Sequence, residues 1–188
     1  LRLSNWLIRQ GLDRVRLGTD VKRETLSADG VPCERIVPPD SRKDRVLLYL
    51  HGARWNLNGN AFRIARLRKM GFSVLAVDYR GFGRSGGDLP SEEEVYADAT
   101  IAWEYLAQRV PSHARRFVFG HSLGGALAID LAARRDDMAG VIVESTLTSI
   151  RDMAGAHKWL RFVPVSLFLT QHYDSLSKIE RVSAPILF

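Results

Sequence analysis

The chain has 188 residues, the size of one domain with a sizeable core, and its 46% hydrophobic and 26% charged residues argue against disorder. No apolar run is long enough to cross a bilayer, and the single cysteine, Cys33, excludes an internal disulfide and a cysteine-rich metal site. The net charge is +6, but the basic residues are scattered among acidic ones and form no basic stripe. We therefore predict a solvated basic surface and no nucleic-acid partner.

Residues 1–22 are predicted to form an N-terminal helical extension. Apolar residues recur there at roughly helical spacing, with arginines between them. A surface helix packed on the core is the interpretation we favour, and a basic segment just after a lost membrane anchor is the alternative. Membrane association is expected only through such a missing anchor. The localisation stays open between cytoplasmic and membrane-tethered.

Residues 23–188 are predicted to form one incomplete α/β domain. Its first part, residues 23–26 and 34–37, suggests an antiparallel hairpin. Short apolar runs then alternate with helical patterns, and such near-continuous apolar strands indicate a mostly parallel sheet with helices on both faces. The predicted strands cover 45–50, 72–77, 116–120 and 139–144, and the predicted helices cover 61–70, 91–109 and 122–135. Ser91 is expected to cap the second helix, because acidic residues fill the turn that follows it.

The segment from about 146 to 180 is predicted to be a lid over a pocket. It is irregular, rich in aromatic and apolar residues, and interrupted by Pro164. Trp159, Phe162 and Phe168 could present an apolar face to a substrate, or could pack in the core. Residues 185–188 then suggest the start of another buried strand, so the strands expected to follow are missing from this sequence.

The candidate nucleophile is Ser122. It lies in Gly120-His121-Ser122-Leu123-Gly124-Gly125, which matches the G-x-S-x-G pattern between a predicted strand and a predicted helix. A turn this tight requires glycines on both sides and lifts the serine hydroxyl above the edge of the sheet. The pattern in this context indicates nucleophilic catalysis. The competing interpretation is a glycine-rich turn with an idle serine.

Four motifs in order give the chain a family resemblance. The motifs are Leu50–Gly52, Asp78–Ser85, Gly120–Gly125 and the closing stretch from Tyr173 to Leu187. With them the chain resembles the α/β-hydrolase superfamily, nearest to its serine-aminopeptidase-like or esterase branch. The resemblance runs from about residue 23 to the end. It implies a serine hydrolase that acts on an ester, thioester or small amide through an acyl-serine intermediate. It also implies a small-molecule acyl substrate and no cofactor or metal.

The same resemblance places an oxyanion hole beside Ser122. One backbone N–H donor would come from Leu123, and the other from Ala53, with Arg54 as the alternative. The loop appears longer than in relatives, because Arg54 to Leu57 look inserted. Arg54 and Trp55 are therefore candidates for shaping the substrate pocket, with packing against the lid as the other interpretation.

The other catalytic groups are expected beyond residue 188. Chain order in this fold is serine, acid, histidine, and no histidine here follows a final strand. Glu144 is a minor candidate for the acid, although we favour hydrogen bonding of its side chain to loop backbone. His51, Asp78 and Asp174 are expected to be structural, and only His172 could swing toward Ser122. The chain alone is predicted to be inactive, so an inactive binding module or an inactive fragment is the alternative function.

Overall fold

The computed structural model describes residues 22–28, 31–37, 45–53, 56–85, 87–155 and 171–188. The strands are β1 (Lys22–Ala28), β2 (Val31–Val37), β3 (Val46–Leu50), β4 (Ser73–Val77), β5 (Arg116–His121), β6 (Gly140–Glu144) and β7 (Ile186–Leu187). The helices are η1 (Asn58–Asn60), α2 (Ala61–Lys69), α3 (Glu92–Arg109), η2 (His113–Arg115), α4 (Leu123–Arg134), α5 (Ile150–Gly155) and α6 (Leu176–Ile179). Within the described ranges no helix is both long and apolar enough to span a bilayer.

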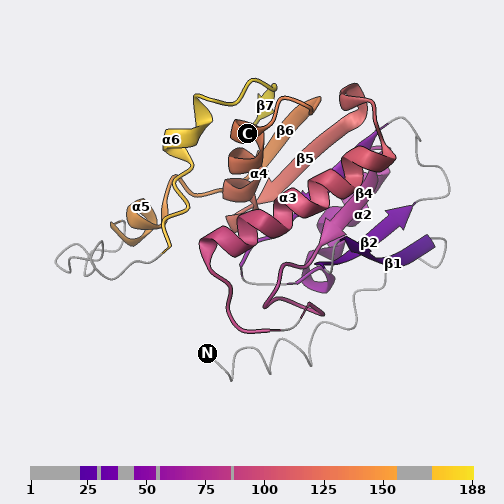
Figure 1. Cartoon of the computed structure of the whole chain (residues 1–188), viewed down its shortest axis with the longest axis horizontal. Coiled ribbons are helices and arrows are strands. Elements are labelled where there is room, and N and C mark those ends of the chain that lie inside the picture. Colours follow the sequence, from indigo (N-terminus) through magenta and orange to yellow (C-terminus); the bar gives the residue numbers. More distant parts are fainter. Residues whose placement is uncertain (1–21, 29–30, 38–44, 54–55, 86, 156–170) are drawn as a thin grey trace.

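One seven-stranded sheet organises these elements, in the order β1-β2-β4-β3-β5-β6-β7 (Figure 1). The strands from β4 to β7 run parallel, and β1 and β2 form the antiparallel hairpin that the sequence predicted. The predicted α/β class with a mostly parallel sheet is therefore confirmed. Each predicted strand and helix lies within a few residues of its predicted range, whereas η1, η2, α5 and α6 were not predicted.

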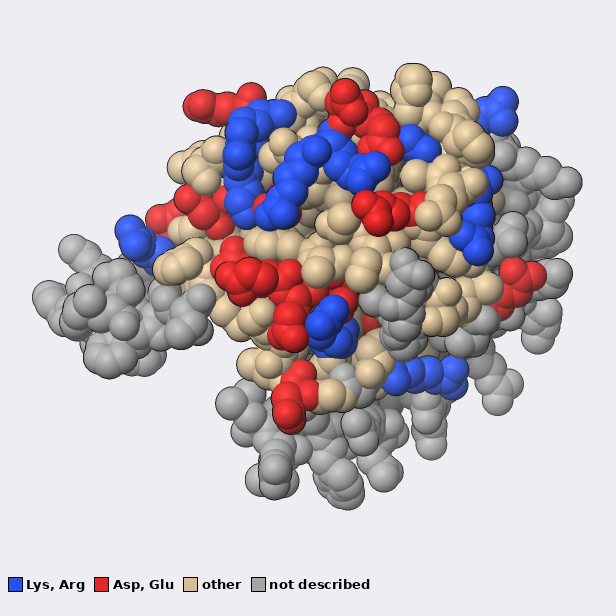
Figure 2. All heavy atoms as spheres, in the orientation of Figure 1, with Lys and Arg blue, Asp and Glu red and all other residues tan. Residues whose placement is uncertain are grey.

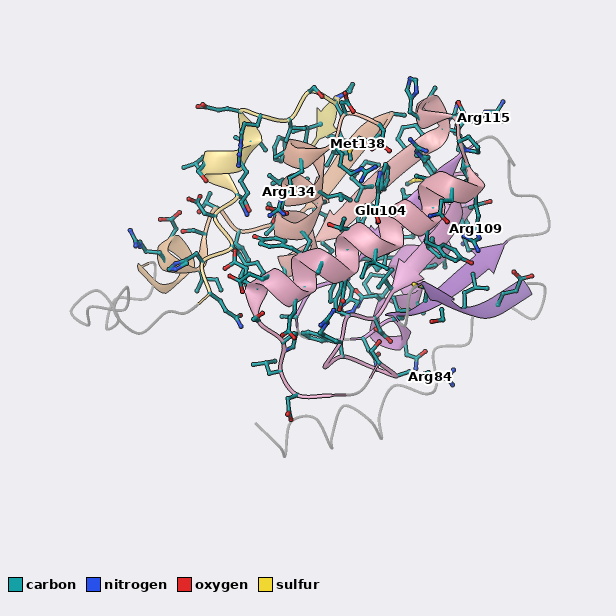
Figure 3. The ribbon with its side chains drawn as sticks, viewed as in Figure 1. Arg84, Glu104, Arg109, Arg115, Arg134 and Met138 are labelled. Atoms are coloured by element: carbon teal, nitrogen blue, oxygen red, sulfur yellow. The ribbon has the colours of Figure 1, made fainter. Side chains whose placement is uncertain are left out.

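Both faces of the parallel sheet are buried, which explains the continuous apolar runs. Along β3, Leu48 and Leu50 pack in the core under α3 and α4, whereas Leu47 and Tyr49 pack in a second core with α2. Successive side chains of a strand point to opposite faces, so a strand covered on both sides must be apolar at every position. Figure 1 shows α3 and α4 in front of the sheet. Met138, labelled in Figure 3, follows α4 and is buried in the first core.

The start of α3 confirms the predicted cap. The Ser91 side chain accepts the Glu94 N–H at 3.2 Å, and the Glu94 carboxylate accepts the Ser91 N–H at 2.8 Å. This reciprocal capping box satisfies two N–H groups that would otherwise lack partners at the helix start. The cap fixes where the chain leaves the loop after β4 and crosses the sheet.

Charged side chains on the face formed by α3, α4 and α6 are mixed in sign (Figure 2). Asp130 pairs with both Arg134 and Lys178, and Arg135 pairs with Glu104 and Asp137. Arg134 on α4 and Glu104 on α3 can be followed in Figure 3. This mixture matches the sequence pattern, and the prediction that no nucleic acid is bound stays a prediction.

Several predictions concern residues outside the described part. These are the N-terminal extension up to residue 21, Arg54 and Trp55, and the central lid residues 156–170 with Trp159, Phe162 and Phe168. The described parts of the predicted lid contain two short helices, α5 and α6. They are held together by backbone hydrogen bonds from Ile150 N–H to His172 O and from Ser175 N–H to Thr148 O.

Candidate active site

Ser122 lies alone between a strand and a helix, as predicted. Strand β5 ends at His121 and helix α4 begins at Leu123, while Ser122 itself adopts φ 54° and ψ −119°. A positive φ is unfavourable for a residue with a side chain, and it persists only where the surroundings enforce it. The sharp turn leaves Ser122 partly exposed at the carboxyl edge of the sheet.

The flanking glycines permit a very close approach of three backbone segments. A Cβ on Gly120 would lie 2.1 Å from the Gly124 carbonyl oxygen, and a Cβ on Gly124 would lie 2.1 Å from the Leu50 carbonyl oxygen. Neither position can hold a side chain without moving backbone. The first turn of α4 therefore packs directly on the ends of β3 and β5, which is the mechanical role that the motif predicted.

The backbone of Ser122 is held mainly by residues at and just after the end of β6. Its N–H donates to the Glu144 carbonyl oxygen at 2.9 Å. Its own carbonyl oxygen accepts the Gly125 N–H at 2.9 Å and the Thr146 hydroxyl at 3.0 Å. Ser145, which lies between Glu144 and Thr146 in the chain, also has a positive φ of 52°. The strained turn is thus fixed from the neighbouring strand on both its donor and its acceptor side.

The two segments expected to form an oxyanion hole both reach Ser122. Leu123 is the first residue of α4, so its N–H belongs to the unpaired N–H groups at the helix start. On the other side, a Cβ on Gly52 would lie only 3.1 Å from the Ser122 Cβ, and the exposed Ala53 comes next. That the Leu123 and Ala53 N–H groups converge on one oxygen stays a prediction.

Buried polar groups hold the loop after β3 at both ends. His51 Nδ1 lies 2.7 Å from the Gly52 carbonyl oxygen, so this nitrogen is the donor. Asp78 Oδ1 accepts the Leu57 N–H at 2.9 Å and lies 3.2 Å from His51 Nε2, a nitrogen for which the described residues provide no hydrogen bond. In addition, the Tyr79 hydroxyl donates to the His51 carbonyl oxygen. These contacts fit the structural roles expected for His51 and Asp78.

Glu144, the minor candidate for the acid, is engaged elsewhere. Its carboxylate accepts from Arg63, with Nε 3.1 Å from Oε2, and Arg63 Nη2 also lies 2.9 Å from His121 Nε2. The described Glu144 side chain forms an ion pair with Arg63. The hydrogen bonding of this side chain to loop backbone that we favoured stays a prediction. Sequence reasoning missed Arg63, since an arginine in an arginine-rich helix carries no distinguishing pattern.

The other described histidines lie apart from the serine hydroxyl. His113 is exposed in η2, and His172 is exposed while its backbone N–H donates to the Glu92 carboxylate. No hydrogen bond joins the Ser122 hydroxyl to a histidine within the described part of the chain. Nor do the described residues contain a group of three or more His, Cys, Asp or Glu placed to hold a metal ion.

A groove of about 440 Å³ lies beside this site, on the α2 side of the sheet. Its lining includes Leu67, Ile142, Glu144, Ser145 and Phe188. Ser122 is not among the lining residues. The groove is therefore not identified with the substrate pocket expected near Arg54 and Trp55, and that pocket stays a prediction.

Comparison with known proteins gives a consistent result. The family described as serine aminopeptidase, S33 matches residues 41–183. The protein Bem46 of Schizosaccharomyces pombe is 33% identical over 181 residues, covering 94% of this chain and 58% of that protein. The zebrafish lysophosphatidylserine lipase ABHD12 is 33% identical over 130 residues, covering 63% of this chain and 33% of that protein. This chain thus spans between a third and three-fifths of the length of these two relatives.

Solved structures show the same fold. An α/β hydrolase from Vibrio vulnificus has a TM-score of 0.71 at 22% identity, covering 98% of this chain and 73% of that chain. An esterase of the bacterial hormone-sensitive lipase family has a TM-score of 0.67 at 21% identity, covering 96% of this chain and 60% of that chain. At these identities the likeness concerns the fold alone.

Proposed function

The chain belongs to the serine aminopeptidase S33 family of α/β hydrolases, and from this premise we propose that Ser122 is the nucleophile of an acyl-transfer reaction. The Ser122 oxygen attacks the carbonyl carbon of an ester, thioester or small amide, and the alcohol, thiol or amine leaves with a proton. Water then attacks the acyl-serine and releases the acid. The strained turn that presents Ser122, at φ 54°, is the observation that carries the proposal.

The oxyanion formed in each step needs preorganised donors. The Leu123 N–H supplies one, because it is free at the start of α4 and lies next to the nucleophile. The Ala53 N–H supplies the other, from a loop whose Gly52 packs against Ser122. His51 and Asp78 support this assignment, since their hydrogen bonds hold the loop and so spare reorganisation during the reaction.

In this proposal the general base is a histidine outside the described residues, in keeping with the chain order of the fold, in which the histidine comes last. The hydroxyl of an isolated serine is a weak nucleophile at neutral pH, so a base within hydrogen-bond reach is required. The described histidines have other partners or lie at the surface, as their contacts with Gly52, Arg63 and Glu92 indicate. The catalytic acid is likewise placed outside the described residues, because Glu144 is paired with Arg63.

Oxygen esters are the substrate class that we place first. The relatives named above include a lysophosphatidylserine lipase. One fold hosts many chemistries, so this ranking rests on similarity and not on a described substrate pocket. Thioesters and small amides follow, because the same oxyanion chemistry serves them.

The proposal is tested with the full-length protein and p-nitrophenyl esters of increasing acyl length. We expect hydrolysis that Ser122→Ala lowers by about 10³-fold or more. Ser145→Ala is the matched control, because Ser145 also has a positive φ and lies one strand away. Equal turnover in Ser122→Ala and the parent protein would refute the nucleophile assignment. Absence of turnover in the parent protein would favour the inactive binding module.

A further inference from the structure

Arg63 connects three elements that meet at the nucleophile. It lies in the first half of α2, the helix that follows the loop after β3, and its side chain is 15% exposed. The guanidinium reaches the carboxyl ends of both neighbouring strands. On β5 its Nη2 lies 2.9 Å from His121 Nε2, and on β6 its Nε and Nη2 lie 3.1 and 3.4 Å from the two Glu144 carboxylate oxygens.

The two partners of Arg63 are also the two residues that hold the Ser122 amide. His121 precedes Ser122 in the chain, and the Glu144 carbonyl oxygen accepts the Ser122 N–H at 2.9 Å. A residue at φ 54° needs neighbours that over-determine its backbone. Arg63 therefore holds the side chains of His121 and Glu144, the two residues whose backbones flank and bind the Ser122 amide.

The His121 ring also touches the loop expected to carry the second oxyanion donor. A Cβ on Gly52 would lie 3.3 Å from His121 Nδ1 and 3.1 Å from the Ser122 Cβ. A side chain at position 52 would therefore crowd both the imidazole and Ser122, so the loop at Gly52 runs close to both residues. A rotation of His121 would displace the loop relative to Ser122.

The contact with Arg63 decides the protonation of His121. A guanidinium can only donate, so His121 Nε2 must accept and the proton of the neutral ring lies on Nδ1. Burial first, and then Arg63 and His51, hold the pKa of His121 below its usual range, whereas Glu144 acts in the opposite direction. The neutral ring that this contact requires is thus favoured at neutral pH.

We propose that Arg63 is a positioning residue for acyl transfer, which sets Ser122 against the donor loop at Gly52 through His121 and Glu144. This rests on the proposed function of Ser122. Simple structural support is the competing role, but the Glu144 side chain is 42% exposed, and an ion pair with an exposed partner contributes little to stability. Displacement of a catalytic group by a fraction of an ångström, in contrast, affects the reaction strongly.

The test compares Arg63→Met with Arg66→Met in the full-length protein. Arg66 is exposed on the same helix, so the two variants remove the same charge from the same element. Reaction with a fluorophosphonate reports the reactivity of the nucleophile without a substrate choice. For Arg63→Met we expect the maximal inactivation rate to fall about tenfold with an unchanged inhibition constant, and for Arg66→Met a rate within about twofold of the parent. Both variants should keep the melting temperature within a few degrees.

Two further readouts separate positioning from general damage. Nitrogen-15 NMR of the labelled His121 ring should show the proton on Nδ1 in the parent, and the pKa of His121 should rise in Arg63→Met, because a nearby positive charge is removed. Arg63→Lys keeps the charge but not the planar fork, and we expect an intermediate inactivation rate.

The outcomes distinguish the two proposals. If the parent reacts at Ser122 and either Arg63 variant reacts at the parent rate, the positioning role is overturned while the nucleophile stands. A proton on His121 Nε2 would also overturn it, since Arg63 could not then donate to that nitrogen. If the parent does not react at Ser122, the proposed function fails and the positioning role fails with it.

Discussion

Two serines follow neighbouring parallel strands, and only Ser122 is proposed as the nucleophile. Ser122 follows β5 at φ 54°, and Ser145 follows β6 at φ 52°. Ser122 leads at once into α4, next to glycines that admit close backbone contact. Ser145 is exposed and leads into a loop, and the next helix begins only at Ile150. A positive φ by itself therefore does not mark a catalytic serine.

The difference lies in what enforces each conformation. The Ser122 N–H and carbonyl are bonded to Glu144 and Thr146, the residues on either side of Ser145. The turn at Ser145 lets Glu144 and Thr146 reach these two groups. The strained backbone conformation of Ser145 thus helps to hold the strained backbone conformation of Ser122. Such conformations persist where the neighbouring residues enforce them. The variants described below test the surroundings of Ser122 and the residue Ser145 separately.

The largest effect is expected for Gly124→Ala. The new Cβ would lie 2.1 Å from the Leu50 carbonyl oxygen and 2.8 Å from that of His51, and both are backbone atoms. We expect a loss of about 3 kcal/mol in the free energy of unfolding, measured by urea denaturation, together with loss of ester hydrolysis. Gly140→Ala in β6 is the control, because its nearest contact at 3.4 Å is an ordinary one. Equal losses of stability and activity in both variants would show that the close contact between the Gly124 position and the Leu50 backbone does not cause the effect.

A smaller effect is expected for Thr146→Val. This change keeps the shape but removes the hydroxyl that donates to the Ser122 carbonyl oxygen at 3.0 Å. The expected cost is about 1 kcal/mol in stability, and a transition-state effect of similar size would lower kcat about fivefold. Thr148→Val is the control, since the Thr148 hydroxyl donates to the exposed Asp152 and not to the turn. An unchanged kcat in Thr146→Val would remove Thr146 from the support of the nucleophile.

The smallest effect is expected for Ser145→Gly. Glycine adopts a positive φ without steric cost, so the substitution relieves strain but makes the unfolded chain more flexible. We expect a change in the free energy of unfolding of about 0.5 kcal/mol or less, because the two terms oppose each other. A loss well above 1 kcal/mol would mean that the Ser145 side chain itself stabilises the fold, and so would weaken the comparison with Ser122.

The sequence predicts those features whose physical cause is local. The role of the glycines around Ser122 can be recognised in the sequence, because only glycine fits a turn with such close backbone contacts. The cap at Ser91 can be recognised because helix caps have a short-range sequence pattern. Arg63 could not be found in this way, since it lies 58 residues from His121 and 81 from Glu144 in the chain. Its role depends on how α2 packs beside two strands. For the same reason the ion pair between Arg63 and Glu144 was not predicted.

The most direct test of the central claim is to map where a fluorophosphonate binds. The full-length protein would be labelled, digested with trypsin and analysed by mass spectrometry. Cleavage after Arg116 and Arg134 gives a peptide in which Ser122 is the only serine, whereas Ser145 falls in a different peptide. The account predicts the label on the Ser122 peptide and none on the Ser145 peptide. Stoichiometric labelling anywhere else, with Ser122 unmodified, would contradict it.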